Sequence, residues 1–417
     1  MTLVGCTKGS GETGGSSAGG TGGAGGATTT VPEGGGGAGG SAVDPKLFAG
    51  VDVSKVELGT APTGCEGGFD ASKGLLSLTF ATGMKGLLLG VVAGKIQANG
   101  VNCTAADGSY ATTDVTKDIE VHGTDADEFV IVDLATGGFG AKVFGDGGIT
   151  VDLGGGKDAF ALRGSLDDDT VAAGSDADKH LVLDVSKRGA PDIDVANSEA
   201  FWFSFGPGKD VFRGTGIAGG AHAAMALALF GDDGDDDLMG GDGDDAMHGG
   251  AGDDLFTTED VPDGADLFDG GAGTDKVDYG ARKGNLVITM AGGADDGEAG
   301  EKDDVNATVE VLFAGAGDDT VTGNDLDNEI HGALGADLLH GGLGADTLFG
   351  DAGDDTLFGD DGDDNLSGQE GIDTLSGGDG ADTLDGGDGA DKYDGGAGDG
   401  DICLIDPSED PVDCELY

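Results

Sequence analysis

Aromatic side chains are scarce in this sequence. They make up 5 % of the 417 residues, whereas glycine alone accounts for 90. A chain of that length is long enough for two or three globular domains, but this composition cannot fill a thick core. The sequence therefore predicts a fold that repeats a small unit and buries a thin stripe of side chains along a stack.

Basic residues are also few. Lys and Arg total 20 against 81 Asp and Glu, which gives a formal net charge of −61. This charge excludes nucleic acid as a partner, because the phosphate backbone is itself an anion. Cations are the natural partners instead. A disordered acidic tail is the alternative to a folded cation-binding protein.

The five cysteines lack the Cys-x-x-Cys or Cys/His spacing of a zinc site. In an oxidising compartment we expect Cys65 to pair with Cys103, although other pairings stay open. Cys403 and Cys414 enclose a short loop and predict a disulfide-closed cap, with two unpaired thiols as the alternative. No apolar run reaches the length of a membrane span.

Residues 1–42 consist mainly of Gly, Ser, Thr and Ala, so we expect a flexible tether there. Leu3-Val4-Gly5-Cys6 resembles the lipobox of bacterial lipoproteins, in which the cysteine becomes the lipidated N-terminal residue. The resemblance implies a lipid anchor at Cys6 and an extracellular or outer-surface location on a bacterium. The basic and apolar segments of a secretory signal do not precede this cysteine, so a chance match is the alternative.

Residues 43–105 have a more ordinary composition, and the alternating apolar residues of 76–80 predict a small β region. Over 106–230 the pattern Gly-x-Gly-Lys-Asp-x-Phe occurs at 154–160 and again at 206–212. We interpret this stretch as a degenerate β-solenoid, with an independent β-sandwich as the alternative. Alanine-rich residues 221–230 predict a short helix.

From residue 314 to residue 394 the sequence steps in units of nine, such as GGLGADTLF from Gly341 and GDAGDDTLF from Gly350. Each unit has one apolar residue between polar or small neighbours, which predicts a three-residue strand with one inward side chain. The other six residues are rich in Gly and Asp and predict a turn. Two units bring the chain round once, so each unit stacks on the next but one. The inward residues are Val321, Ile330, Leu339, Leu348, Leu357, Leu366, Leu375, Leu384 and Tyr393.

This stacking places the turn aspartates in two ladders with rungs about 4.8 Å apart. Neighbouring carboxylates at that distance repel by roughly 1 kcal/mol even in bulk water, so cations are needed between the rungs. Sites with oxygen ligands in flexible turns select calcium, and folding and calcium binding should be one event. One ladder holds Asp319, Asp337, Asp355, Asp373 and Asp391, and the other holds Asn328, Asp346, Asp364 and Asp382.

These units resemble RTX, or haemolysin-type, calcium-binding repeats over 231–257 and 314–403, and more weakly over 261–278. The resemblance implies a parallel β-roll in which turns of successive coils sandwich each ion. The matching metal ligands are Asp236, Asp245, Asp254, Asp266, Asp275, Asp319, Asp337, Asp346, Asp355, Asp364, Asp373, Asp382 and Asp391. Asn328 replaces one aspartate, and Gly400 lengthens the last unit.

Catalytic motifs are lacking. There is no His-Glu-x-x-His, and Gly-x-Ser-x-Gly occurs only within the tether. His248, His331 and His340 occupy the ninth, outward position of their units, where no histidine site is expected. We predict no catalytic residue and no organic cofactor.

The predicted protein is all-β. A first repeat block at 231–278, an insertion at 279–313, the main β-roll at 314–403 and a cap at 404–417 follow the tether and the degenerate solenoid. The predicted function is binding of several calcium ions with calcium-dependent folding of an extracellular structural or binding protein. The alternatives are a calcium-dependent polysaccharide lyase or epimerase and an adhesin. Both would use the middle region, residues 43–230, to bind a cell-surface or polysaccharide partner. For the adhesin the aromatic cluster at 201–203 is the candidate contact, with the local core of the solenoid as the alternative.

Overall fold

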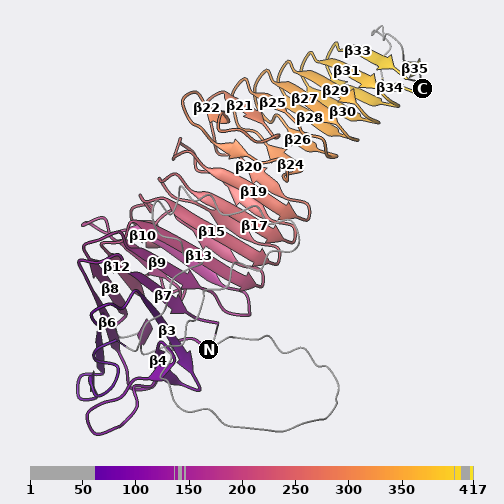
Figure 1. Ribbon diagram of the computed structural model, residues 1–417. Coiled ribbons are helices and arrows are strands. Elements are labelled where there is room, and N and C mark those ends of the chain that lie inside the picture. The colour runs from indigo at the N-terminus through magenta and orange to yellow at the C-terminus, as the bar shows by residue number, and fades with distance from the viewer. Residues whose placement is uncertain are drawn as a thin grey trace, which may run out of the picture.

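The computed structural model shows a long β-solenoid whose strands stack along one axis (Figure 1). It describes residues 62–135, 137–139, 143–144, 147–398, 400–404 and 414–416. The lipobox-like start, the tether and the expected lipid anchor lie outside these residues. Within them, no helix has the length and apolar character needed to span a membrane. The predicted all-β solenoid is confirmed.

One sheet, which we name the long sheet, runs the whole length of the solenoid and is mostly parallel. It contains eighteen strands. They are β1 Phe69–Asp70, β2 Leu75–Thr79, β6 Asp118–Thr124, β8 Ile149–Gly154, β10 Thr170–Ser175, β11 Leu181–Asp184, β12 Ile193–Ala196, β14 Val211–Arg213, β16 Asp237–Met239, β18 Leu255–Thr257, β20 Lys276–Asp278, β24 Val311–Phe313, β26 Glu329–His331, β28 Thr347–Ala352, β30 Asn365–Glu370, β32 Thr383–Asp388, β34 Ile402–Leu404 and β35 Glu415–Leu416.

The opposite face is divided into two sheets. The first contains β3 Gly86–Val92, β4 Lys95–Ala98, β5 Val101–Asn102, β7 Phe129–Asp133, β9 Ala159–Arg163, β13 Ala200–Pro207, β15 Leu227–Asp233, β17 Ala246–Ala251, β19 Leu267–Ala272 and β23 Asp304–Val305. The second contains β21 Leu286–Thr289, β22 Gly297–Glu298, β25 Thr320–Thr322, β27 Leu338–Leu343, β29 Thr356–Asp361, β31 Thr374–Asp379 and β33 Lys392–Ala397. The division falls within the insertion, because β23 ends the first sheet while β21 and β22 begin the second.

The repeats stack as the sequence predicts. In the long sheet Leu348 pairs with Leu366, and on the opposite face Leu357 pairs with Leu375. Each unit therefore lies on the next but one, and successive units alternate between the two faces. All nine predicted inward side chains are buried, with exposures between 0 and 4 %. They extend one continuous apolar core that runs from Cys65 to Cys403.

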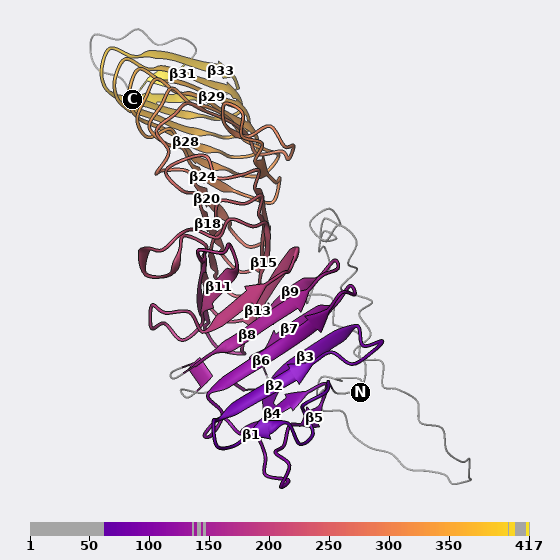
Figure 2. The same ribbon diagram turned by 90° about the vertical axis from the view of Figure 1, so that its left-hand side faces the viewer.

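The middle region is part of the same solenoid. Strands β7, β9, β13 and β15 pair in parallel and continue into β17 of the first repeat block. Figure 2 shows these strands side by side in one sheet, and the longest of them, β13, has eight residues where a C-terminal strand such as β29 has six. The degenerate solenoid is thus confirmed over the sandwich alternative.

The helix predicted over 221–230 is wrong. Leu227 starts strand β15, and Leu227 and Leu229 are both fully buried. Alternating inward side chains and pairing with strands on both sides outweigh the helical propensity of alanine in so short a segment. Residues 221–230 contain no helical turn, and the three-residue 3-10 turn η2 (Ile217–Gly219) lies just before them.

The aromatic cluster of the middle region is buried on both faces of its sheet, because Phe201 and Phe203 belong to the continuous core whereas Trp202 lies in a second buried cluster. Phe201, Trp202 and Phe203 lie in β13 with exposures of 5, 9 and 0 %. Trp202 packs edge-on against Phe230 with ring centroids 5.8 Å apart. Such buried rings offer no contact surface, so this cluster does not support an adhesin.

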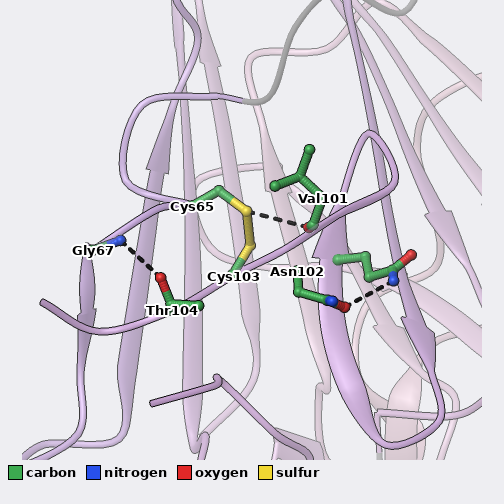
Figure 3. Close-up of a disulfide and its surroundings, with 7 residues drawn as sticks. Cys65, Gly67, Val101, Asn102, Cys103 and Thr104 are labelled. Atoms are coloured by element: carbon green, nitrogen blue, oxygen red, sulfur yellow. Dashed lines mark hydrogen bonds between the residues drawn. A yellow bond between two sulfur atoms is a disulfide. The ribbon is translucent and has the colours of Figure 1, made fainter. Parts of the chain in front are cut away.

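Both expected disulfides form. Cys65 is bonded to Cys103, and both residues are fully buried (Figure 3). A hydrogen bond from the Gly67 N–H to Thr104 Oγ1 at 3.1 Å ties the same two segments together. At the other end Cys403 is bonded to Cys414, where β35 pairs with β34 and covers the last edge of the long sheet.

We expect the double change Cys65→Ala and Cys103→Ala to destabilise the N-terminal end of the solenoid. The bond closes a loop with a sequence separation of 38 residues. Removing it should lower the free energy of unfolding by about 4 kcal/mol, since the unfolded chain regains the entropy of that loop. Urea unfolding followed by Trp202 fluorescence measures this change. An unchanged midpoint would show that the bond does not stabilise the fold.

Candidate metal sites

The thirteen predicted ligands all lie at the end of a turn, directly before a strand, and their exposures range from 0 to 5 %. Carboxylates are seldom buried without a partner, because removal from water costs several kcal/mol. The turns therefore keep these thirteen carboxylates buried although burial without a partner would destabilise the fold.

Backbone hydrogen bonds align the aspartates into two columns. The N–H of Asp337 donates to Asp355 Oδ1 at 2.8 Å, and that of Asp355 donates to Asp373 Oδ1 at 2.8 Å. The same bond links Asp319 to Asp337 and Asp373 to Asp391. The second column runs from Asn328 through Asp346, Asp364 and Asp382 to Asp401. In the first block, Asp236, Asp254, Asp275 and Glu310 continue the pattern, and so do Asp245, Asp266 and Asp303.

The second carboxylate oxygen distinguishes the sites. In nine of the predicted ligands Oδ2 is buried and has no hydrogen-bond partner among the described residues. An uncompensated buried carboxylate oxygen is costly, and a cation is the simplest partner for it. These nine residues are Asp236, Asp254, Asp275, Asp337, Asp346, Asp355, Asp364, Asp373 and Asp382.

The space beside each oxygen exists because the first residue of the unit is glycine. A Cβ added to Gly350 would lie 2.4 Å from Asp355 Oδ2 and 2.9 Å from the carbonyl oxygen of Gly368. A Cβ added to Gly359 would lie 2.3 Å from Asp364 Oδ2. Each turn thus gathers carboxylate and carbonyl oxygens around a small opening, which is the all-oxygen donor set that calcium prefers. The residues fit calcium.

Electrostatics favour a positive ligand in these columns. Burial raises the pKa of Asp254, Asp275 and Asp337 to about 7, and neighbouring carboxylates add to the rise. Burial likewise raises the pKa of Asp373 and Asp382 to about 6. At neutral pH these buried carboxylates therefore favour the binding of a proton or a cation that neutralises their charge.

Three predicted ligands differ from these nine. Asp245 Oδ2 accepts a hydrogen bond from the Gly241 N–H at 2.6 Å, and Asp319 Oδ2 accepts one from the Gly315 N–H at 3.2 Å. Asp266 lies between Asp245 and Asp303, and its pKa is raised well above the usual value, mainly by burial. The thirteenth predicted ligand, Asp391, keeps the column bond to Asp373.

The insertion supplies its own cation next to this part of the column. The side chain of Arg282 is fully buried, and its Nη2 lies 2.6 Å from Asp263 Oδ1 and 2.9 Å from Glu301 Oε1. The Tyr279 hydroxyl donates to Asp303 Oδ2 at 2.9 Å. The Arg282 guanidinium and the Tyr279 hydroxyl thus pair with three carboxylates next to this part of the column, those of Asp263, Glu301 and Asp303.

The two departures noted in the sequence leave the columns intact. The N–H of Asn328 still donates to Asp346 Oδ1 at 2.7 Å, although an amide brings no negative charge to its turn. The last bond of that column joins Asp382 to Asp401 across 19 residues instead of 18, because Gly400 lengthens the unit. Gly400 has a φ of +115°, which suits glycine in such an expanded turn.

The structure adds two residues that the sequence analysis did not select, Asp158 and Asp210. Both are fully buried, both have an Oδ2 without a partner among the described residues, and burial raises their pKa to about 6 and about 7. The N–H of Asp210 donates to Asp236 Oδ1 at 2.7 Å, so the column continues into the middle region. The shared Gly-x-Gly-Lys-Asp-x-Phe pattern was the signal that marked them.

A second hydrogen bond shows that these turns have the geometry of the repeats. In the repeats the residue before the column aspartate donates its N–H to the residue at the same position of an adjacent coil. Ala336, for example, donates to Asp318 Oδ1 at 3.1 Å. Lys157 makes the same bond to Asp127 and Lys209 to Asp168, both at 3.0 Å. The conformation of the turn is therefore preserved where the sequence has diverged.

Comparison with known proteins agrees with this geometry. The family model described as RTX calcium-binding nonapeptide repeat (4 copies) matches residues 229–260, 263–281, 306–339, 331–366, 340–375 and 367–402. No curated protein matches the chain. The matched residues of the chain therefore consist of RTX calcium-binding repeats, and these repeats bind Ca²⁺.

Proposed function

We propose that calcium is held by the nine aspartates whose Oδ2 lacks a partner, together with Asp158 and Asp210, and that calcium folds the solenoid into a stiff extracellular rod. The buried, unpartnered Oδ2 atoms carry this proposal. Each bound ion would neutralise the charge of its turn and attach one coil to the next, as the glycine openings beside these oxygens allow.

Two features support an extracellular location. Calcium modules that work outside cells have dissociation constants of roughly 10⁻⁴–10⁻³ M, so such a chain would fold only where calcium is abundant. Disulfides also persist mainly in oxidising compartments, and the bonds Cys65–Cys103 and Cys403–Cys414 use four of the five cysteines. Cys6 remains for the proposed lipid anchor.

The substitution Asp355→Asn tests the assignment. An amide keeps the oxygen that accepts the Asp337 N–H but replaces Oδ2 with a donor that repels a cation. We expect the full-length protein to lose about one bound ion in isothermal titration calorimetry. Its folding midpoint should also move to a higher calcium concentration.

Asp385→Asn is the matched control. Asp385 lies at the outward end of its unit and is exposed, so the variant loses the same charge without touching a turn. We expect its ion count and its midpoint to equal those of the parent protein. Equal ion counts in all three proteins would refute the assignment of Asp355 as a ligand.

A further inference from the structure

Three side chains outside the carboxylate columns meet at one edge of the solenoid. His222, Asp242 and Glu259 lie in three consecutive turns, those that cross from β14 to β15, from β16 to β17 and from β18 to β19. Their ligand atoms all lie within 4.8 Å of one another. Residues far apart in the sequence thus form one cluster.

The backbone fixes these positions. The N–H of Asp242 donates to the Ala223 carbonyl oxygen at 2.7 Å, which joins the first two turns beside His222. The N–H of Thr258, directly before Glu259, donates to the Asp278 carbonyl oxygen at 3.1 Å. The cluster is therefore set by the register of the coils and not by the free rotation of surface side chains.

Hydrogen bonding alone does not satisfy the cluster. His222 Nδ1 lies 2.8 Å from Asp242 Oδ1 and also 2.8 Å from Glu259 Oε2. One ring nitrogen carries at most one hydrogen, so it cannot donate a straight bond to both carboxylates. The side chain of Glu259 is only 5 % exposed, and its Oε1 is buried with no hydrogen-bond partner among the described residues. The carboxylates of Asp242 and Glu259 thus share one ring nitrogen of His222, and the buried Glu259 Oε1 beside them is unsatisfied.

Nearby charges do not neutralise the negative charge of this cluster. Asp263 is a further negative neighbour of Glu259, and Arg282 a positive one. Arg282 is already engaged by Asp263 and Glu301. A cation bound between His222, Asp242 and Glu259 would neutralise the excess negative charge of the cluster. The nearby Arg282 guanidinium would lower the affinity for that cation.

The donor set points to a metal other than calcium. One imidazole nitrogen with two carboxylates suits zinc and related transition metals, whereas the calcium columns offer oxygen alone. His222 and Asp242 have side-chain exposures of 37 and 55 %, so water can reach the cluster and complete the coordination. We propose that His222, Asp242 and Glu259 bind a divalent transition-metal ion of the zinc class, separate from the calcium sites.

Other histidines serve as internal comparisons. His340 Nδ1 faces one carboxylate, Asp360, at 2.9 Å, and its ring stacks on Phe358. His180 lies 3.4 Å from both Asp176 and Asp194, but all three of those side chains are about one third exposed. The His180 cluster also has a buried oxygen without a partner among the described residues, Asp194 Oδ1, but its carboxylates lie 3.4 Å from the ring nitrogen, whereas those of the His222 cluster lie at 2.8 Å.

The test uses the untagged full-length protein saturated with calcium, so that the coils are folded before zinc is added. Equilibrium dialysis against Zn²⁺ should give one ion that remains bound in the presence of excess calcium. His222→Gln should abolish this ion, and Glu259→Gln should weaken it by more than about tenfold, since even supporting residues of metal sites contribute that much. His340→Gln, a matched removal of a histidine, should leave it unchanged.

Two outcomes would overturn the proposal. If the parent protein and His222→Gln bind the same amount of zinc, the cluster is not a metal site. If His180→Gln instead loses the ion, zinc binds at the other cluster. Neither result touches the calcium proposal, because calcium-dependent folding is measured separately by circular dichroism in every variant.

Discussion

Removal of calcium with EGTA should abolish most of the β signal that residues 229–402 contribute to the far-UV circular dichroism of the full-length protein. Neighbouring carboxylates repel by roughly 1 kcal/mol per pair even in bulk water, and the two columns contain many such pairs. A domain is stable by only about 5–15 kcal/mol, so the sum of these repulsions is decisive. Re-addition of calcium should restore the signal cooperatively.

The single tryptophan shows which part of the chain responds. Trp202 is buried in the middle region, where large rings such as Phe160, Phe203 and Phe212 fill the core. We expect its fluorescence to remain blue-shifted at EGTA concentrations that remove the β signal of the repeats, because that core depends less on ions. Magnesium is the control and should not restore the signal, since it demands an octahedral site. A circular dichroism spectrum that is the same with and without calcium would contradict the assignment of the columns.

Acid should partly replace calcium. In the folded protein without ions the pKa of Asp254, Asp275 and Asp337 is about 7, whereas the ordinary value is 3.8. A raised pKa means that the folded state binds protons more tightly than the unfolded state does. This contribution to stability is complete below about pH 4 and is lost as the pH rises through about 7. The calcium-free protein should therefore be more stable at pH 5.5 than at pH 8.

The far-UV β signal of the full-length protein in EGTA at pH 5.5, 6.5, 7.5 and 8.5 measures this effect, at values kept above the sequence pI of 4.1 to limit precipitation. The signal should fall steadily across the series. In a parallel calcium titration the affinity should be lower at pH 5.5, because protons compete for the same oxygens. A β signal that rises with pH in EGTA would show that the buried carboxylates are not protonated in the folded state.

The sequence predicts the repeat region in detail because its period is strict. One apolar residue in nine, as at Leu348, Leu357 and Leu366, determines which side chains face the core. Once that register is known, the aspartate two residues before each inward side chain falls at the end of a turn, so candidate ligands such as Asp355 follow directly. The backbone bond from each aspartate to the next was not predictable, since it depends on the geometry of the turn.

Other features could not be predicted, because they lie where the nine-residue period is interrupted. Asp158 and Asp210 are separated by a long excursion through β10, β11 and β12, so no count of residues reveals that they belong to columns. The hydrogen bond that Gly241 makes to Asp245 depends on backbone conformation alone. The His222 cluster arises from irregular turns of unequal length. A composition rich in aspartate gives no indication of which carboxylates will meet.

The asymmetry between the two faces has a mechanical consequence. The long sheet passes through the insertion without interruption, from β20 to β24, whereas the opposite face changes there from one sheet to another (Figure 1). Tension along the rod would be carried past this point by the continuous ladder of the long sheet. Bending that opens the divided face would meet less resistance than bending that stretches the long sheet. The insertion thus gives the rod a preferred direction of flexure, because the two sheets of the divided face are joined by an isolated bridge between Asp296 and Asp303 instead of a continuous parallel ladder.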